Sequence, residues 1–142
     1  TTMEDKAVRK KGAGFVIFKK GSIEKGEPTI LALIQEDGVL DLPKGRIDPG
    51  ETPLETAVRE CFEECSLVIG RKDMILNDVD PFVYGALTLF CAESPHTRPA
   101  ITVNPHNGVL EHVGFKWVNQ EEFLDNCLPF LAPGVSYFYS KL

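Results

Sequence analysis

The sequence predicts a single α/β (α+β) domain in which a mixed β-sheet is flanked by helices. Strongly apolar runs of strand length occur in both halves of the chain, and a central segment carries apolar side chains at helical spacing. The 142 residues suit one domain with one core, and 43% of them are hydrophobic, as in ordinary soluble domains. We therefore expect one domain over residues 1–142, with a flexible N-terminal segment at residues 1–10.

Strands are predicted where short apolar runs are bounded by turn residues. These runs are Gly12–Phe18, Thr29–Gln35, Val39–Leu42, Phe82–Cys91 and His112–Val118. Between Pro43 and Pro53 the chain holds three prolines and two glycines, which predicts a loop without regular structure. The polar, proline-rich stretch from Glu93 to Asn107 is a second predicted loop.

The central helix is predicted to begin at Thr52, which can cap it while Pro53 takes the first position and Glu55 completes a capping box. Its apolar side chains recur at helical spacing and are expected to pack in the core. They are Leu54, Ala57, Val58, Cys61, Phe62 and Cys65. The opposite side of this helix is acidic, so one side can anchor to the sheet while the other faces a cleft.

Two further helices are predicted near the C-terminus. Asn119 can cap the first of them, with Glu122 reaching back to the cap. Pro129 interrupts the apolar segment that follows. Pro133 can then open a last helix that runs through Ser136–Lys141.

The overall composition excludes several classes of function. The formal net charge of −6 argues against indiscriminate binding to DNA or other nucleic acid. No apolar stretch approaches the roughly 18 residues that a membrane span requires. The N-terminal sequence TTMEDKAVRKK lacks the apolar segment of a signal peptide, so a cytoplasmic location is expected.

The cysteines and histidines do not predict a disulfide framework or a zinc site. Cys61 and Cys65 fall on the apolar side of the central helix, and buried, reduced thiols are the expected state of all four cysteines. The chain has no CxxC pair, and its histidines show no ligand spacing. These histidines are His96, His106 and His112.

The most informative pattern is a set of acidic residues around one arginine. Glu60, Glu63 and Glu64 stand at i, i+3 and i+4, so a helix places their carboxylates on one face. Glu51 and Arg59 precede them at fixed offsets. Like charges at this spacing destabilise a helix by a few tenths of a kcal/mol per pair unless a cation lies among them. A hard divalent cation such as Mg²⁺ is the natural candidate, because it binds carboxylate and phosphate oxygens.

The alternative interpretation of these glutamates is a solvated outer face of a helix, which is common. However, with each residue type near 6% of an average composition, Gly45 and the five charged residues would occur at these six offsets roughly once in 10⁷ starting positions. Chance is therefore a poor explanation of the pattern.

The segment GRIDPGETPLETAVRECFEECSL resembles the Nudix box, Gly-x5-Glu-x7-Arg-Glu-U-x-Glu-Glu-x-Gly-U, in which U is a bulky aliphatic residue. The matching residues are Gly45, Glu51, Arg59, Glu60, Glu63, Glu64 and Leu67. Cys61 replaces the first U, a mild change because a free cysteine behaves as a small hydrophobe. Ser66 replaces the second glycine, which commonly supplies a left-handed helix end, so the helix is expected to run on toward Gly70.

The resemblance implies the Nudix α/β/α sandwich, with the box as a loop-helix-loop motif. It also implies a hydrolase of phosphoanhydride bonds that depends on Mg²⁺, with Mn²⁺ as an alternative. Glu60 and Glu64 would be the principal metal ligands, and the carbonyl of Gly45 another. Glu63 would be a further ligand or the base that activates water.

Three more residues receive roles from the resemblance. Glu51 and Arg59 would pair, which braces the loop against the helix and orients the carboxylates. The segment LEHVGFKWV resembles the Glu-His-x4-Trp region of many Nudix enzymes, in which Glu111 would be an additional ligand or base. A surface acid is the alternative for Glu111, and the choice of Glu63 or Glu111 as general base stays open.

Three segments together resemble the asymmetric diadenosine tetraphosphate (Ap4A) hydrolases. They are GFVIFKK near Gly14, LPKGRIDPGE from Leu42, and the Glu111 region. The substrate implied is a nucleoside diphosphate linked to another moiety, such as a dinucleoside polyphosphate. The tryptophan that usually precedes the Pro-Lys-Gly segment is absent, because residues 40–42 are Leu-Asp-Leu.

Substrate contacts are expected from Lys44 and Arg46 beside the box, and from Tyr84 and Tyr137, whose rings can stack on adenine. Trp117 is expected to pack in the core. The partner is a small-molecule nucleotide, and both a monomer and a homodimer are compatible with the sequence.

Several alternative functions stay open. Within the same class they are hydrolysis of (d)NTPs, of capped or triphosphorylated RNA 5′ ends, of nucleotide sugars or of diphosphoinositol phosphates. In a different class is a non-catalytic, nucleotide-sensing Nudix-like domain. Ser66 is the only feature of the box that favours this sensor.

Overall fold

The structure is a computed structural model that describes residues 11–74 and 79–142. Its strands are β1 (Gly12–Phe18), β2 (Ile30–Ile34), β3 (Leu40–Asp41), β4 (Lys44–Arg46), β5 (Phe82–Tyr84), β6 (Leu87–Glu93) and β7 (Gly114–Val118). Its α-helices are α2 (Pro53–Cys65), α3 (Gln120–Asn126) and α4 (Ala132–Tyr139), with short 3-10 helices at Arg71–Asp73 and Pro129–Leu131. The predicted flexible segment 1–10 lies outside the described residues.

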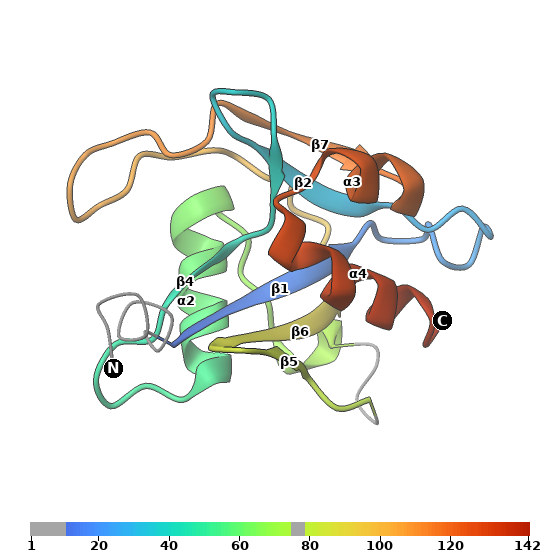
Figure 1. Cartoon of the computed structure of the whole chain (residues 1–142), viewed down its shortest axis with the longest axis horizontal. Helices are drawn as coiled ribbons and strands as arrows, with labels where there is room; N and C mark the ends of the chain where they lie inside the picture. The colour runs from blue at the N-terminus through green and yellow to red at the C-terminus, as the bar shows by residue number, and fades with distance from the viewer. Residues whose placement is uncertain (1–10, 75–78) are drawn as a thin grey trace.

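The strands form one mixed sheet in the spatial order β3-β2-β1-β6-β5, with β4 paired to β1 and β7 paired to β2. Helix α2 packs on β1 and β4, whereas α4 packs on β5 and β1 from the other side and contacts α3 (Figure 1). The sheet is therefore the middle layer, which confirms the predicted α/β/α sandwich and its loop-helix-loop motif.

Strand β1 is the centre of the sheet. It pairs in parallel with β6 along its whole length, from Gly12 opposite Leu87 to Phe18 opposite Glu93. All of its side chains from Ala13 to Phe18 are buried, because both faces of the sheet are covered. Successive side chains point to opposite faces, so Val16 and Phe18 join the core under α4 while Phe15 and Ile17 join the core under α2.

Two predictions about the strands were wrong. The segment expected to be an irregular loop contains β4, because Lys44–Arg46 pairs with Gly12–Gly14 of β1 despite the surrounding prolines. The single long strand expected over Phe82–Cys91 is a hairpin, β5 and β6, joined by a two-residue turn. Gly85 has a φ of 61° in this turn, a conformation that glycine adopts without steric cost.

Helix α2 begins as predicted but ends earlier. Thr52 caps it with both hydrogen bonds of a capping box, to and from Glu55. The helix stops at Cys65 rather than running on toward Gly70, so that prediction was wrong. Ser66 adopts the left-handed conformation itself, with φ 65° and ψ 16°, and its hydroxyl donates a hydrogen bond to the Ala100 carbonyl at 3.0 Å. The serine thus reproduces the cap that glycine provides elsewhere.

The apolar stripe of α2 is narrower than predicted. Ala57, Cys61 and Cys65 are fully buried against the sheet. Leu54 is 37% exposed and Phe62 is 55% exposed, so the prediction that they pack in the core was wrong. Because 3.6 residues make one turn, a stripe of six apolar positions covers more of the helix surface than a flat sheet can contact.

The remaining local predictions were mostly confirmed. Asn119 caps α3 by accepting a hydrogen bond from the Glu122 amide, although the Glu122 carboxylate pairs with Lys116 at 2.7 Å instead of reaching back to the cap. All four cysteines are free thiols, and three are buried as predicted, whereas Cys127 is only partly buried. In the described part of the chain, no helix is long and apolar enough to cross a membrane.

Candidate functional site

The site forms where β4 passes under the acidic face of α2. Pairing of β4 with β1 holds Gly45 directly against Glu60, and a methyl group added to Gly45 would overlap the Glu60 carboxylate. Only glycine therefore allows this approach of main chain to carboxylate. The structure places the Gly45 main chain beside the acids, whereas its role as a carbonyl ligand stays a prediction.

The predicted pairing of Glu51 with Arg59 is confirmed. Arg59 Nε donates to one carboxylate oxygen of Glu51 at 2.8 Å, and Nη2 donates to the other at 3.0 Å. Nη2 also donates to the carbonyl of Arg46, which ties the preceding loop to the helix. Hydrogen bonds from Arg59 and then from Thr56 lower the pKa of Glu51 to about 2. Glu51 is therefore a fixed anion that holds the guanidinium in place.

The acidic face of α2 meets the same guanidinium. Arg59 Nη1 donates to Glu60 at 2.9 Å and lies 3.3 Å from both carboxylate oxygens of Glu63. Glu64 points inward and accepts a hydrogen bond from the Lys44 amide at 3.2 Å. The helix thus presents Glu60, Glu63 and Glu64 together, as the spacing predicts.

The carboxylates of Glu60 and Glu64 lie in contact and share a buried environment. Burial raises the pKa of Glu64, and the negative charge of Glu60 raises it further. Burial also raises the pKa of Glu60, although hydrogen bonds and the charge of Arg59 oppose that shift. Removing two neighbouring carboxylates from water disfavours negative charge on both, which raises the affinity of the pair for a proton or a cation.

A small hollow opens over these acids. Its volume is about 10 Å³, close to that of one water-sized sphere. The loop that follows β6 forms one wall, because Thr102 donates a hydrogen bond to the carbonyl of Glu63 in α2. The residues that line the hollow are Glu60, Glu63, Glu64, Thr102, Asn104, Pro105, Glu111 and His112.

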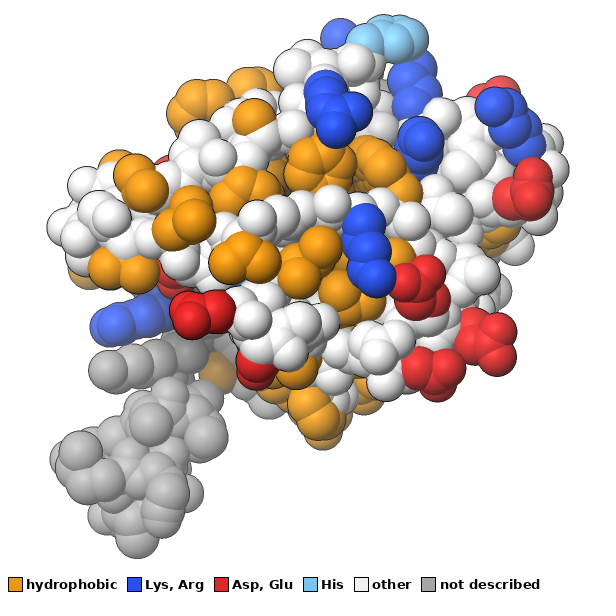
Figure 2. Space-filling model, turned by 90° about the horizontal axis from the view of Figure 1, so that it is seen from above, with side chains coloured by type: hydrophobic (Ala, Val, Ile, Leu, Met, Phe, Trp, Pro, Cys, Tyr) orange, Lys and Arg blue, Asp and Glu red, His pale blue; other side chains and the backbone are white. Residues whose placement is uncertain are grey.

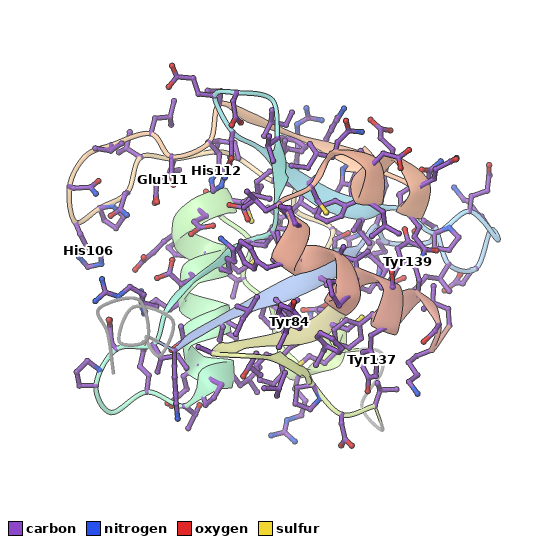
Figure 3. The ribbon with its side chains drawn as sticks, viewed as in Figure 1. Tyr84, His106, Glu111, His112, Tyr137 and Tyr139 are labelled. Atoms are coloured by element: carbon purple, nitrogen blue, oxygen red, sulfur yellow. The ribbon has the colours of Figure 1, made fainter. Side chains whose placement is uncertain are left out.

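Glu111 reaches the hollow from outside the box. Asn104 donates a hydrogen bond to its carboxylate at 2.9 Å, which fixes the side chain across the loop. Figure 3 shows Glu111 and His112 beside the end of α2, with His106 farther out on the loop. The structure therefore brings all six predicted catalytic residues into one region of the molecule, whereas their catalytic roles stay predictions.

The sequence did not identify a buried polar network next to the acids. Asp41 contacts His112 Nε2 at 3.0 Å and Lys44 Nζ at 3.1 Å. Burial alone would raise the pKa of Asp41, but the hydrogen bond from His112 and the charge of Lys44 lower it. The sequence signal that could have identified Asp41 is its position between two leucines at the end of an apolar strand.

The four predicted substrate contacts lie at different distances from the acids. Lys44 is next to them, and its ammonium lies over the ring of Phe130 at 5.6 Å. Arg46 is exposed at the end of β4. Tyr84 and Tyr137 lie apart from the hollow, on the α4 side of the sheet, and both pack against Phe82 (Figure 3). Their substrate contacts stay predictions.

The donor set fits a hard divalent cation. It consists of carboxylates, two of which are crowded and buried, and Gly45 lets the main chain lie against one of them. Within residues 11–74 and 79–142, no group of three acidic, histidine or cysteine side chains is arranged around one point as a complete metal site. The Arg59 guanidinium pairs with Glu60 at 2.9 Å and with Glu63 at 3.3 Å. A divalent cation would compete with Arg59 for these two carboxylates.

Comparison with known proteins identifies the family. The NUDIX domain model matches residues 8–139, nearly the whole chain. The chain belongs to the Nudix family. It is therefore a hydrolase that acts on pyrophosphate bonds, in a family that generally uses divalent metal ions and small nucleotide substrates.

Two curated relatives and one solved structure give more detail. The mouse asymmetrical bis(5′-nucleosyl)-tetraphosphatase is 29% identical over 123 residues, which are 79% of this chain and 80% of that protein. The RNA pyrophosphohydrolase of Brucella anthropi is 36% identical over 78 residues, or 49% of this chain and 45% of that protein. The crystal structure of a C. elegans Ap4A hydrolase binary complex has a TM-score of 0.70 and 22% identity, covering 92% of this chain and 96% of that one.

Proposed function

We propose that this Nudix hydrolase is a Mg²⁺-dependent pyrophosphohydrolase of dinucleoside polyphosphates such as Ap4A, with Mn²⁺ as an alternative metal. The observation that supports it most is the convergence of Glu60, Glu63 and Glu64 on an ion-sized hollow that Glu111 also lines. A pyrophosphate resists attack because its anionic oxygens repel the nucleophile, so a cation-binding hollow is what its hydrolysis requires. We place the enzyme in the cytoplasm, as a monomer or a homodimer.

Each residue of the site has a part in this mechanism. Glu60 and Glu64 would hold the cation, and Glu51 holds Arg59 so that the acids keep their orientation. The chemistry that a bound divalent cation would supply is neutralisation of phosphate charge and acidification of water. Glu63 or Glu111 accepts the proton of the attacking water at a carboxylate oxygen. Lys44 lies beside Glu64 and Phe130, where its ammonium can contact a phosphate of the substrate.

The substrate class rests on the relatives. The mouse relative that spans most of the chain is named as a tetraphosphatase of bis(5′-nucleosyl) compounds, and the C. elegans structure as an Ap4A hydrolase. The Brucella anthropi relative is named as an RNA pyrophosphohydrolase and spans about half of the chain. RNA 5′ ends are therefore the second candidate substrate.

A panel of substrates tests the proposal. The purified protein is incubated with Ap4A, ATP, a nucleotide sugar, diphosphoinositol phosphate and 5′-triphosphorylated RNA, each with Mg²⁺, with Mn²⁺ and with EDTA. We expect the highest kcat/KM for Ap4A, with ATP and AMP as products, and no turnover in EDTA. A higher kcat/KM for RNA than for Ap4A would make RNA 5′ ends the preferred substrate. Turnover in EDTA would contradict the metal dependence.

A further inference from the structure

A second, larger cleft lies on the sheet away from the acidic hollow. Its volume is about 520 Å³, within the range of roughly 300–1,000 Å³ that small-molecule sites occupy. It opens where β1 and β6 end and where β7 presents its aromatic side chains. The lining residues are Lys19, Lys20, Ser94, Pro95, His96, Thr97, Arg98, Pro99, Phe115 and Trp117. None of these residues lines the acidic hollow.

The floor of the cleft is aromatic and its rim is cationic. Phe115 and Trp117 are two positions apart along β7, so both rings lie on the same face of the sheet. Both side chains are partly exposed. The Lys19 ammonium lies 5.9 Å from the ring centroid of Trp117. The Arg98 guanidinium lies 5.3 Å from that of Phe115. Figure 2 shows Lys, Arg and His side chains gathered beside hydrophobic ones at the upper edge of this view.

The charge in this cleft is only partly compensated. No aspartate or glutamate is among its lining residues in the described ranges. Glu93 lies behind Lys20, with a charge separation of 3.8 Å, and also accepts a hydrogen bond from the Gly21 amide. The charged groups of Lys19 and Arg98 each lie over an aromatic ring. An anion would therefore find two or three cations in a protein whose formal net charge is −6.

We propose that this cleft is a second nucleotide-binding site, separate from the catalytic hollow. The base stacks on Phe115 and Trp117 in place of the Lys19 and Arg98 side chains, because aromatic rings stack on any base. The phosphates lie between Lys19, Lys20 and Arg98. The ligand is a single nucleotide with two or more phosphates, since the cleft has the size of one small molecule.

Trp117 provides a direct readout, because it is the only tryptophan in the chain. The full-length protein is titrated with ATP in EDTA, which prevents metal-dependent binding at the acids. We expect saturable quenching of the tryptophan fluorescence, confirmed by calorimetry under the same conditions. Absence of both signals up to millimolar ATP would overturn the proposal.

Variants assign the signal to the cleft. The double variant Lys19→Gln/Arg98→Gln is expected to bind ATP about tenfold more weakly, because it removes two cation contacts. Lys141→Gln is the matched control, since Lys141 also lies over an aromatic ring, Tyr137, but outside the cleft. It is expected to bind ATP as the wild type does. Equal affinities of the double variant and the wild type would overturn the proposal.

Further ligands test which part of the nucleotide is bound. Adenosine and tripolyphosphate are each expected to bind at least about tenfold more weakly than ATP, because each lacks one of the two contacts. Tripolyphosphate that binds as tightly as ATP would reduce the cleft to an anion site without base recognition. A short single-stranded RNA that binds more tightly than ATP would make nucleic acid the ligand and overturn the assignment to a single nucleotide.

The test is independent of the proposed catalytic function. The double variant should hydrolyse Ap4A with an unchanged kcat, because neither substituted side chain lines the acidic hollow. ATP binding in EDTA would support the second site even if Ap4A proves not to be the substrate. A loss of kcat in a folded double variant would show that the cleft is part of the active site, which contradicts a separate site.

Discussion

Glu51 and Glu64 are the same residue type and belong to the same short motif, but their surroundings shift their pKa values in opposite directions. Glu51 receives two hydrogen bonds from Arg59 and one from Thr56, which lower its pKa to about 2. Glu64 is buried beside Glu60, which raises its pKa. A carboxylate with a fixed cation is stable as an anion, whereas a carboxylate without one is ready to accept a cation from solution.

The largest expected effect of this difference is on the catalytic activity of variants at the two positions. Glu64→Gln keeps the shape of the side chain but removes the charge that would hold the cation, so we expect Ap4A hydrolysis to fall by about 10²–10⁴-fold. Glu51→Gln should cost less, about tenfold, because Glu51 acts by positioning Arg59. Steady-state kinetics over a range of Mg²⁺ concentrations would measure both.

Two controls accompany these kinetics. Circular dichroism should show that both variants are folded. An additional control, Glu55→Gln, alters a carboxylate that belongs to the capping box of the same helix and does not line the hollow, so its kcat should match the wild type. Near wild-type turnover in Glu64→Gln would refute the metal-binding role of Glu64.

The pH dependence of stability should differ in sign between the two regions. In EDTA, the raised pKa of Glu64 makes its contribution to stability complete below about pH 4.5, and this contribution is lost as the pH rises through the folded-state pKa. The lowered pKa of Glu51 has the opposite effect, because its contribution is complete above about pH 4.5 and is lost as the pH falls toward 2.

Melting temperatures between pH 3 and pH 9 would separate the two effects. We expect Glu64→Gln to flatten the decline of the metal-free protein on the alkaline side, and Glu51→Gln to flatten the decline on the acid side. Adding Mg²⁺ to the wild type should also flatten the alkaline side, because the cation compensates the charge of the acids. An alkaline decline in Glu64→Gln as steep as that of the wild type would contradict the buried pair as its cause.

Substitutions of Ser66 are expected to have the smallest effect, because this residue ends helix α2 without contacting the carboxylate of Glu51 or of Glu64. Ser66→Gly relieves a left-handed serine, which costs about 1–2 kcal/mol, but loses the hydrogen bond to Ala100, which contributes about 0.5–1.5 kcal/mol. We expect the free energy of unfolding to change by less than about 1 kcal/mol, with kcat unchanged. Ser66→Ala keeps the strain and loses the hydrogen bond, so chemical denaturation should find it less stable than Ser66→Gly.

The parts of the site that depend on neighbouring residues were predictable from the sequence. The cap at Thr52 and the common face of Glu60, Glu63 and Glu64 follow from positions within a few turns of one helix. The pairing of Glu51 with Arg59 came from the resemblance to the Nudix box and is present in the structure. The mixed sheet followed from the order of the apolar runs.

The parts that depend on distant residues were not predictable in the same way. Asp41 and His112 are 71 residues apart in the chain and meet only because β2 pairs with both β3 and β7. Strand β4 forms because the edge of β1 is available to it, not because its own residues favour a strand. The exposure of Phe62 depends equally on what surrounds the helix, which helical spacing does not report.

The parallel pairing of β1 with β6 has a consequence for the order of folding. The central strand of the sheet ends at Phe18, but its partner is complete only at Glu93. During synthesis, the edge of β1 that pairs with β6 is therefore covered only after residue 93 has emerged, and such long-range pairing is slow. A chaperone that shields the nascent N-terminal strand would raise the yield of this enzyme more than one that acts on its locally folded C-terminal helices.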